Sequence, residues 1–224
     1  MPEVSDALKP ERSGRLVRFA VLAYIGFLVL LPLAALAQHG LKSGFSALME
    51  ALSTPGALHA LWHTLWSAGV MTLVNAVMGT AAAWALVRYR FPGRSFLSTL
   101  VDLPFAIPTL VTGVMLVILY GPHGLLGGWL ADAGFKVAFA PPGIMLALLF
   151  VTLPFVVRTV EPVLLEQDPA EEEAARTLGA GPWTIFRRVL LPPLLPAILS
   201  GAVRSFARAL GEFGSIVVVS GNIP

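Results

Sequence analysis

Five long apolar stretches alternate with shorter polar or glycine- and proline-rich segments along this chain. A transmembrane α-helix needs about 20 predominantly apolar residues, and each stretch is close to or above that length. Because backbone polar groups cannot stay unpaired in lipid, the pattern predicts an all-α, polytopic transmembrane helix bundle. The predicted parts are an N-terminal segment at 1–18 and one transmembrane domain at 19–224, with spans at 19–37, 58–87, 96–120, 141–160 and 194–219 and a charged loop at 161–192.

The first predicted span has a second interpretation. A basic start followed by Ala35-Leu36-Ala37 before Gln38 is also typical of a secretory signal peptide with its cleavage site. The apolar core of a signal peptide is about 7 to 15 residues long. The apolar run 19–37 is longer than that, which favours a retained first span.

Composition supports a membrane protein. Of the 224 residues, 56% are hydrophobic and 12% are charged, and the mean hydropathy is +0.79, whereas soluble domains average about 25% charged residues. The net charge of +2 does not indicate a nucleic-acid partner, because the basic residues form no patch interleaved with aromatic side chains. Without cysteine the chain has no disulfide framework, thiolate metal site or cysteine nucleophile.

Basic residues are distributed unequally between the two sets of alternate loops. One side has only Lys42 and Lys136. Cytoplasmic loops of membrane proteins carry the excess of Lys and Arg. This rule predicts a cytoplasmic N-terminus and a cytoplasmic 161–192 loop in a bacterial inner membrane. The basic residues on that side are Lys9, Arg12, Arg15, Arg18, Arg88, Arg90, Arg94, Arg158, Arg176, Arg187 and Arg188.

The charged loop carries the signals of a helix, a turn and a second helix. Asp168 is a good N-cap, Pro169 suits the first helical position, and Glu171 stands where a capping-box carboxylate reaches back to the cap. Gly179 can take the left-handed conformation that ends the helix. Pro182 then predicts the start of a second short helix, whose mixture of aromatic and basic residues is typical of a membrane surface.

This loop also resembles the signature of the permease subunits of ABC importers. The matching residues are Glu173-Ala174-Ala175, Gly179, Val189 and Leu191-Pro192 in the family's register. The resemblance implies a type I (MetI-like) permease fold, in which the short helix docks on an ATPase subunit. An ordinary amphipathic hairpin is the alternative. The docking residues that the resemblance to ABC importer permeases implies are Glu171, Glu172, Glu173, Ala174, Ala175, Arg176, Leu178 and Gly179.

Two sets of ionisable residues fall within the predicted spans. Arg204, Arg208 and Glu212 are spaced four apart, which places them in one stripe of a helix. Such groups at membrane depth face the bundle interior or an aqueous path. The stripe therefore either lines the path of an anion or forms an internal ion pair, with Arg208 and Glu212 as the expected pair. Asp102 is likewise either accommodated inside the bundle or hydrated near the interface.

Further stretches resemble the sulfate/thiosulfate permeases of the CysT type, and less closely their CysW-type sisters and the molybdate permeases. They are Leu-Gly-Glu-Phe-Gly at 210–214 and LVDLPFAIPTLVTG at 100–113. The resemblance implies a sulfate/thiosulfate importer with a CysW-type sister subunit, two copies of a CysA-type ATPase and a periplasmic binding protein. Since such permeases continue beyond residue 223, it also implies a sixth span missing by truncation.

The chain has no Walker A, HExxH or GxSxG sequence, so no enzymatic site of its own is predicted. No cofactor is expected in this chain, and ATP and Mg would bind the partner ATPase. His59 and His63 lack a carboxylate or thiolate beside them, which argues against a metal site. The alternatives are a permease for molybdate, tungstate or another oxyanion, an integral membrane enzyme that uses Asp102, Glu212 and these histidines, and a non-transporting membrane scaffold.

Overall fold

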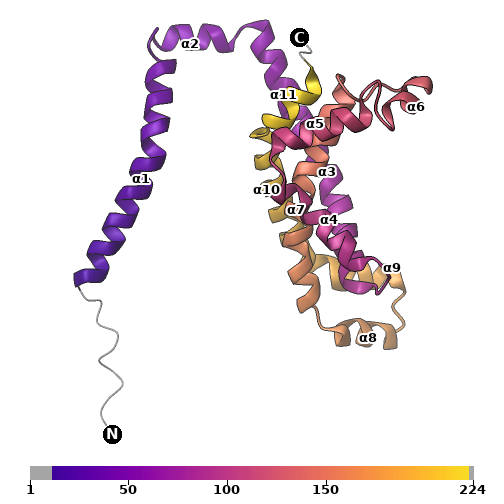
Figure 1. Cartoon of the computed structure of the whole chain (residues 1–224). Coiled ribbons are helices and arrows are strands. Elements are labelled where there is room, and N and C mark those ends of the chain that lie inside the picture. Colours follow the sequence, from indigo (N-terminus) through magenta and orange to yellow (C-terminus); the bar gives the residue numbers. More distant parts are fainter. Residues whose placement is uncertain (1–11, 222–224) are drawn as a thin grey trace. The chain divides into compact units, whose positions relative to one another are not determined.

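The computed structural model describes residues 12–221, which form helices and contain no strand (Figure 1). Part of the predicted N-terminal segment and residues 222–224 lie outside this range. Four of the described helices are long and apolar enough to cross a membrane, and a bent pair makes a fifth candidate. The elements are α1 (Arg12–Gly40), α2 (Phe45–Leu52), α3 (Pro55–Arg88), α4 (Arg94–Ala106), α5 (Thr109–Tyr120), α6 (Gly127–Asp132), α7 (Pro141–Glu166), α8 (Pro169–Thr177), α9 (Pro182–Ile185), η2 (Phe186–Leu190), α10 (Leu191–Leu210) and α11 (Gly214–Ser220).

The chain divides into two compact units, Met1–Leu61 and Trp62–Pro224. The elements predicted from the sequence include no helix in the segment 38–57 between the first two spans, but in the first unit α2 occupies Phe45–Leu52 of it. The glycines and the proline that flank α2 are typical of loops, and they hide the helical pattern of its apolar residues. Within the segment, apolar residues recur at the i, i+3, i+4 and i+7 positions of an amphipathic helix.

The core of the second unit is built around α7. Val156 is fully buried and contacts both α3 and α10 at positions where the facing residue is glycine. A Cβ added at Gly79 of α3 would stand 2.8 Å from the Val156 Cβ, and one added at Gly201 of α10 would stand 2.9 Å from its Cα. Small residues at such positions let transmembrane helices approach closely, where lipid supplies no hydrophobic force between them.

A buried polar contact also joins α3 to α7. Asn75 is fully buried, and its Nδ2 donates to the Leu149 carbonyl at 3.2 Å and to Thr152 Oγ1 at 2.6 Å. The Thr152 hydroxyl in turn donates to the Leu148 carbonyl. Because these groups would be costly to leave unpaired in an apolar interior, the contact fixes the register of the two helices.

The single span predicted for 96–120 is divided into α4 and α5, whose axes meet at 118°. Pro108 lacks the N–H that would continue the helical ladder. It also excludes the helical conformation from the residue before it, and Ile107 has extended dihedrals, φ −98° and ψ 128°. Pro104, by contrast, is accommodated inside α4.

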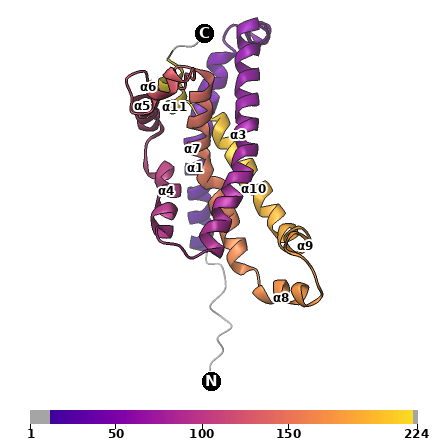
Figure 2. The ribbon, with the colours of Figure 1, turned by 90° about the vertical axis from the view of Figure 1, so that its right-hand side faces the viewer.

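The span predicted for 194–219 is also interrupted, between the end of α10 and the start of α11. Glu212 lies in the interruption and accepts hydrogen bonds from the Ser215 backbone N–H at 2.9 Å and from its hydroxyl at 2.8 Å. These bonds satisfy donors at the first turn of α11. In Figures 1 and 2, α5, α6 and α11 lie at one end of the second unit, and α8 and α9 lie at the other.

Candidate functional site

The charged loop begins with the helix that the sequence predicts. Asp168 is the N-cap of α8, its Oδ1 accepts from the Ala170 N–H at 2.9 Å, and Pro169 is the first helical residue. Gly179 follows the helix with φ +82°, in the left-handed region. The predicted N-cap, first helical residue and left-handed glycine are confirmed, and the helix ends at Thr177 with Leu178 as its C-cap.

The second half of the loop differs from the prediction of a separate surface helix. A helical segment does begin at Pro182, but it continues through the π-helical turn η2 directly into α10. The whole stretch Pro182–Leu210 is therefore one continuous helical path. Consequently α8 is followed by an element that leads without a break into the bundle.

Of the three adjacent glutamates in α8, only Glu172 faces the rest of the unit. Its side chain is 13% exposed, whereas Glu171 and Glu173 are exposed. A Glu172 carboxylate oxygen lies 2.6 Å from Arg88 Nη1 at the end of α3, and the other lies 3.7 Å from Arg176 Nη2. Arg88 thus fixes the rotation of α8 about its axis.

Arg88 holds several elements at once. Its Nη2 donates to Gln167 Oε1 at 3.2 Å, and Gln167 Nε2 donates to the Leu190 carbonyl at 3.0 Å. Its guanidinium carbon lies 5.3 Å from the centre of the Trp84 ring, within cation–π range. We call Trp84, Arg88, Gln167 and Glu172 the α8 anchor. Sequence reasoning missed Arg88 and Gln167, because nothing local to either residue indicates these partners.

The outer side of the loop combines acidic and apolar groups. Leu178 is 88% exposed and Trp183 is 70% exposed. A cleft of about 440 Å³ lies between α8 and α9, lined among others by Trp84, Glu172 and Phe186. Such a surface suits another protein chain better than a small ligand. Of the other predicted docking residues, Ala175 is half-buried, and the exposed ones are Ala174, Arg176 and Gly179.

The predicted charged stripe is only partly continuous. Arg208 Nη1 and Glu212 Oε2 form an ion pair at 2.7 Å, with the Glu212 side chain 1% exposed. Glu212 lies beyond the end of α10, and Arg204 is exposed. Asp102 does not join this set. It lies on α4 and pairs with Arg158 of α7 at 2.6 Å. Within residues 12–221, no three His, Asp or Glu side chains gather as ligands for a metal ion.

Comparison with known proteins assigns the family. Residues 75–222, more than half of the chain, match the model of the family described as the binding-protein-dependent transport system inner membrane component. That range contains the whole α8 anchor, the docking signature and the charged stripe.

Several curated relatives are sulfate transport system permease proteins. The probable cysT protein of Nephroselmis olivacea is 47% identical over 94% of this chain and 75% of its own length. The Escherichia coli K12 protein CysT is 46% identical over 90% of this chain and 73% of its own length. CysW of the same strain is 44% identical over 88% and 68%.

A solved structure has the same fold. A chain of a bacterial ABC transporter involved in the import of the acidic polysaccharide alginate superimposes with a TM-score of 0.74, covering 94% of this chain and 78% of that chain at 20% identity. The prediction of an all-helical ABC importer permease is confirmed. The chain is thus a multi-pass protein of the inner membrane, and it belongs to the family of inner membrane components of binding-protein-dependent transport systems, the permeases of ABC importers.

Proposed function

We propose that this chain is a permease subunit of an ATP-driven importer that carries sulfate across the inner membrane. The observation that carries the proposal is the identity of 44–47% to sulfate transport system permeases over about nine tenths of the chain. The sister subunit would be of the CysW type, with two copies of a CysA-type ATPase and a periplasmic sulfate- or thiosulfate-binding protein. ATP and Mg would bind the ATPase.

We further propose that α8 is the surface on which the ATPase acts. The exposed carboxylates of Glu171 and Glu173, together with Leu178 and Trp183, supply a mixed acidic and apolar contact. The α8 anchor supports this role, because a helix that transmits force must be fixed to the elements it moves. A displacement of α8 would pass directly into α7 before it and into α10 after it, producing rigid-body motion of the spans.

We assign the residues of the charged stripe to both roles that the sequence leaves open, an internal ion pair and the path of an anion. The Arg208 guanidinium is matched by the buried Glu212 carboxylate, which also caps α11, so this pair serves the packing of the bundle. Arg204 is exposed on α10. A cation within a span avoids lipid and faces water or another protein, so we assign Arg204 to the path of the anion between the permease subunits.

The docking role is tested by Glu173→Lys, with Glu50→Lys on α2 as the matched control because both residues are exposed acids. We expect Glu173→Lys to lower both co-purification of the ATPase and sulfate uptake, while insertion into the membrane persists. Glu50→Lys should leave ATPase co-purification unchanged. Normal ATPase association in Glu173→Lys would refute the docking role.

Orientation and substrate need separate measurements. Since the chain has no cysteine, Leu178→Cys gives a single label site on an exposed side chain. An impermeant thiol reagent should label it only after the inner face of the membrane is opened, and labelling from the periplasm would contradict the cytoplasmic placement of α8. For the substrate, unlabelled sulfate should compete with radioactive sulfate uptake far better than molybdate does; the opposite order would refute a sulfate importer.

A further inference from the structure

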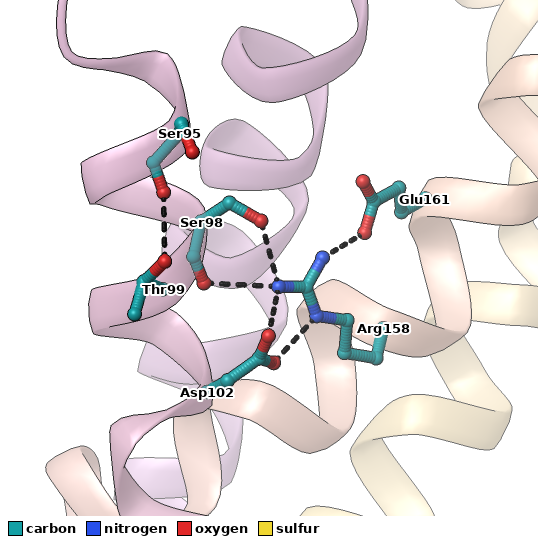
Figure 3. A network of polar contacts seen from close by, with 6 residues as sticks. All are labelled: Ser95, Ser98, Thr99, Asp102, Arg158 and Glu161. Atoms are coloured by element: carbon teal, nitrogen blue, oxygen red, sulfur yellow. Dashed lines mark hydrogen bonds and ion pairs between the residues drawn. The ribbon is translucent and has the colours of Figure 1, made fainter.

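Arg158 on α7 holds α4 with a fixed, multidentate geometry (Figure 3). Its Nε donates to Asp102 Oδ1 at 2.7 Å and its Nη2 donates to Asp102 Oδ2 at 2.6 Å. The same Nη2 donates to the Ser98 carbonyl at 2.9 Å and to the Ser98 hydroxyl at 2.8 Å. We call Ser98, Asp102 and Arg158 the α4–α7 clamp. A two-point guanidinium–carboxylate pair fixes orientation as well as distance, which a single contact does not.

The clamp does more than neutralise the charge of Arg158. Glu161, one turn further along α7, also pairs with Arg158 through its Nη1. This pair lies within one helix, and it already supplies one negative charge to the partly exposed Arg158 guanidinium. Asp102 therefore adds a second acid from a different helix. What Asp102 contributes beyond Glu161 is the attachment of α4 to α7.

The clamp lies on the docking side of two proline positions. In the bent pair, Pro108 separates α4 from α5, and α5 packs closely on α11, where a Cβ at Gly113 would stand 2.8 Å from the Ser215 carbonyl oxygen. In α7, Pro154 precedes Arg158 by one turn and removes one backbone hydrogen bond from the helix. The half of α7 after Pro154 carries the clamp and a second proline, Pro162, and it continues as one helix to Glu166, shortly before α8.

We propose that Asp102 and Arg158 are positioning residues for transport: they make α4 move together with the half of α7 that leads into the docking helix, so that the chain bends at Pro108. The inference rests on the proposed docking of the ATPase on α8. Each nucleotide-driven displacement of α8 is then delivered through the clamp to the bent pair α4–α5. Without the clamp, α8 still binds the ATPase, but α4 no longer follows it.

The test uses the complete importer reconstituted in liposomes with its ATPase and binding protein. Asp102→Asn keeps the size of the side chain and removes its charge, and Asp102→Ala removes both hydrogen-bond acceptors. Arg158 keeps Glu161 as its partner in both variants, which limits the cost to folding. The matched controls are Glu161→Gln, which breaks only the pair within α7, and Thr99→Val, which changes an α4 hydroxyl bonded to its own helix at Ser95.

The measured quantity is sulfate transported per ATP hydrolysed, with ATPase co-purification measured in parallel. The Asp102 side chain is 49% exposed, so solvent weakens its pair with Arg158. We expect Asp102→Ala to lower this ratio by about three- to tenfold and Asp102→Asn to lower it less. ATPase co-purification should stay within about twofold of the parent protein. Both controls should keep the ratio of the parent protein.

Two results would overturn the inference. One is an unchanged transport ratio in Asp102→Ala. The other is an equal loss of ratio in Glu161→Gln, which would show that local charge, and not the link between helices, matters. Failure of the docking proposal is seen separately, as normal ATPase association in Glu173→Lys.

Discussion

Replacing Arg88 by glutamine is the sharpest test of how α8 is held. The substitution removes the ion pair to Glu172, the hydrogen bond to Gln167 and the contact with the Trp84 ring. Because Glu172 keeps only the more distant Arg176, at 3.7 Å, the rotation of α8 is no longer fixed by α3. We expect the helix to form but to sample several orientations.

The magnitude follows from the burial of the pair. The side chains of Arg88 and Glu172 are 21% and 13% exposed, so solvent screens their attraction only in part. A hydrogen bond to a charged group contributes about 1.5–3 kcal/mol, and a cation–π contact about 0.5–1 kcal/mol where it is accessible to water. Allowing for the remaining contact with Arg176, we expect Arg88→Gln to reduce the free energy that favours the anchored orientation of α8 by about 2 kcal/mol. That corresponds to at most about 30-fold weaker binding of a partner that needs the anchored orientation.

The assay is titration of the ATPase subunit against the permease heterodimer in nanodiscs. Arg88→Gln should weaken binding, whereas Arg90→Gln, which removes the same charge from an exposed residue in the loop directly after α3, should not. In a double-mutant cycle, Arg88→Gln and Glu172→Gln should be strongly non-additive, since each removes the same pair. Equal affinities for the two arginine variants, or additive effects in the cycle, would refute the anchor.

The remaining predictions concern the packing of the bundle, measured as unfolding in detergent. Gly79→Ala should lower the free energy of unfolding by about 1–3 kcal/mol, because its Cβ would stand 2.8 Å from the Val156 Cβ; Gly69→Ala, which meets nothing within 4 Å, should not lower it. Asn75→Ala should cost about 2 kcal/mol by removing the buried contact between α3 and α7. Glu212→Gln should lower the free energy of unfolding by about 1–2 kcal/mol, since its partner Arg208 can still reach water. An unchanged free energy of unfolding in Asn75→Ala or in Glu212→Gln would contradict the described polar contacts.

Local signals in the sequence were sufficient where the structure depends on neighbouring residues. The start of α8 follows from Asp168 and Pro169, and its end from Gly179, because capping and left-handed backbone are properties of a few consecutive residues. The bend at Pro108 obeys an equally local rule. The length of the apolar run alone predicts one span, whereas the rule for the residue before a proline places a break at Ile107.

The rotation of α8 could not be predicted in the same way. Glu171, Glu172 and Glu173 are identical in type and adjacent, so no local rule distinguishes the one that faces inward. The choice depends on Arg88, which the fold brings to 2.6 Å from Glu172 from the end of a distant helix. Asp102 is a similar case, because its partner Arg158 is separated from it by the whole of α5 and α6.

The sequence by itself determined that lipid is the solvent of this protein, that its backbone is helical and where the charged loop begins. Those properties follow from composition and from hydrogen bonds within short windows, since a helix in lipid must pair its own backbone groups. Only the tertiary structure decided which acid faces which arginine, and hence which helices are fixed to one another. Such pairs form between residues far apart in the chain, and the packing of glycines such as Gly79 against α7 sets the distances at which they meet.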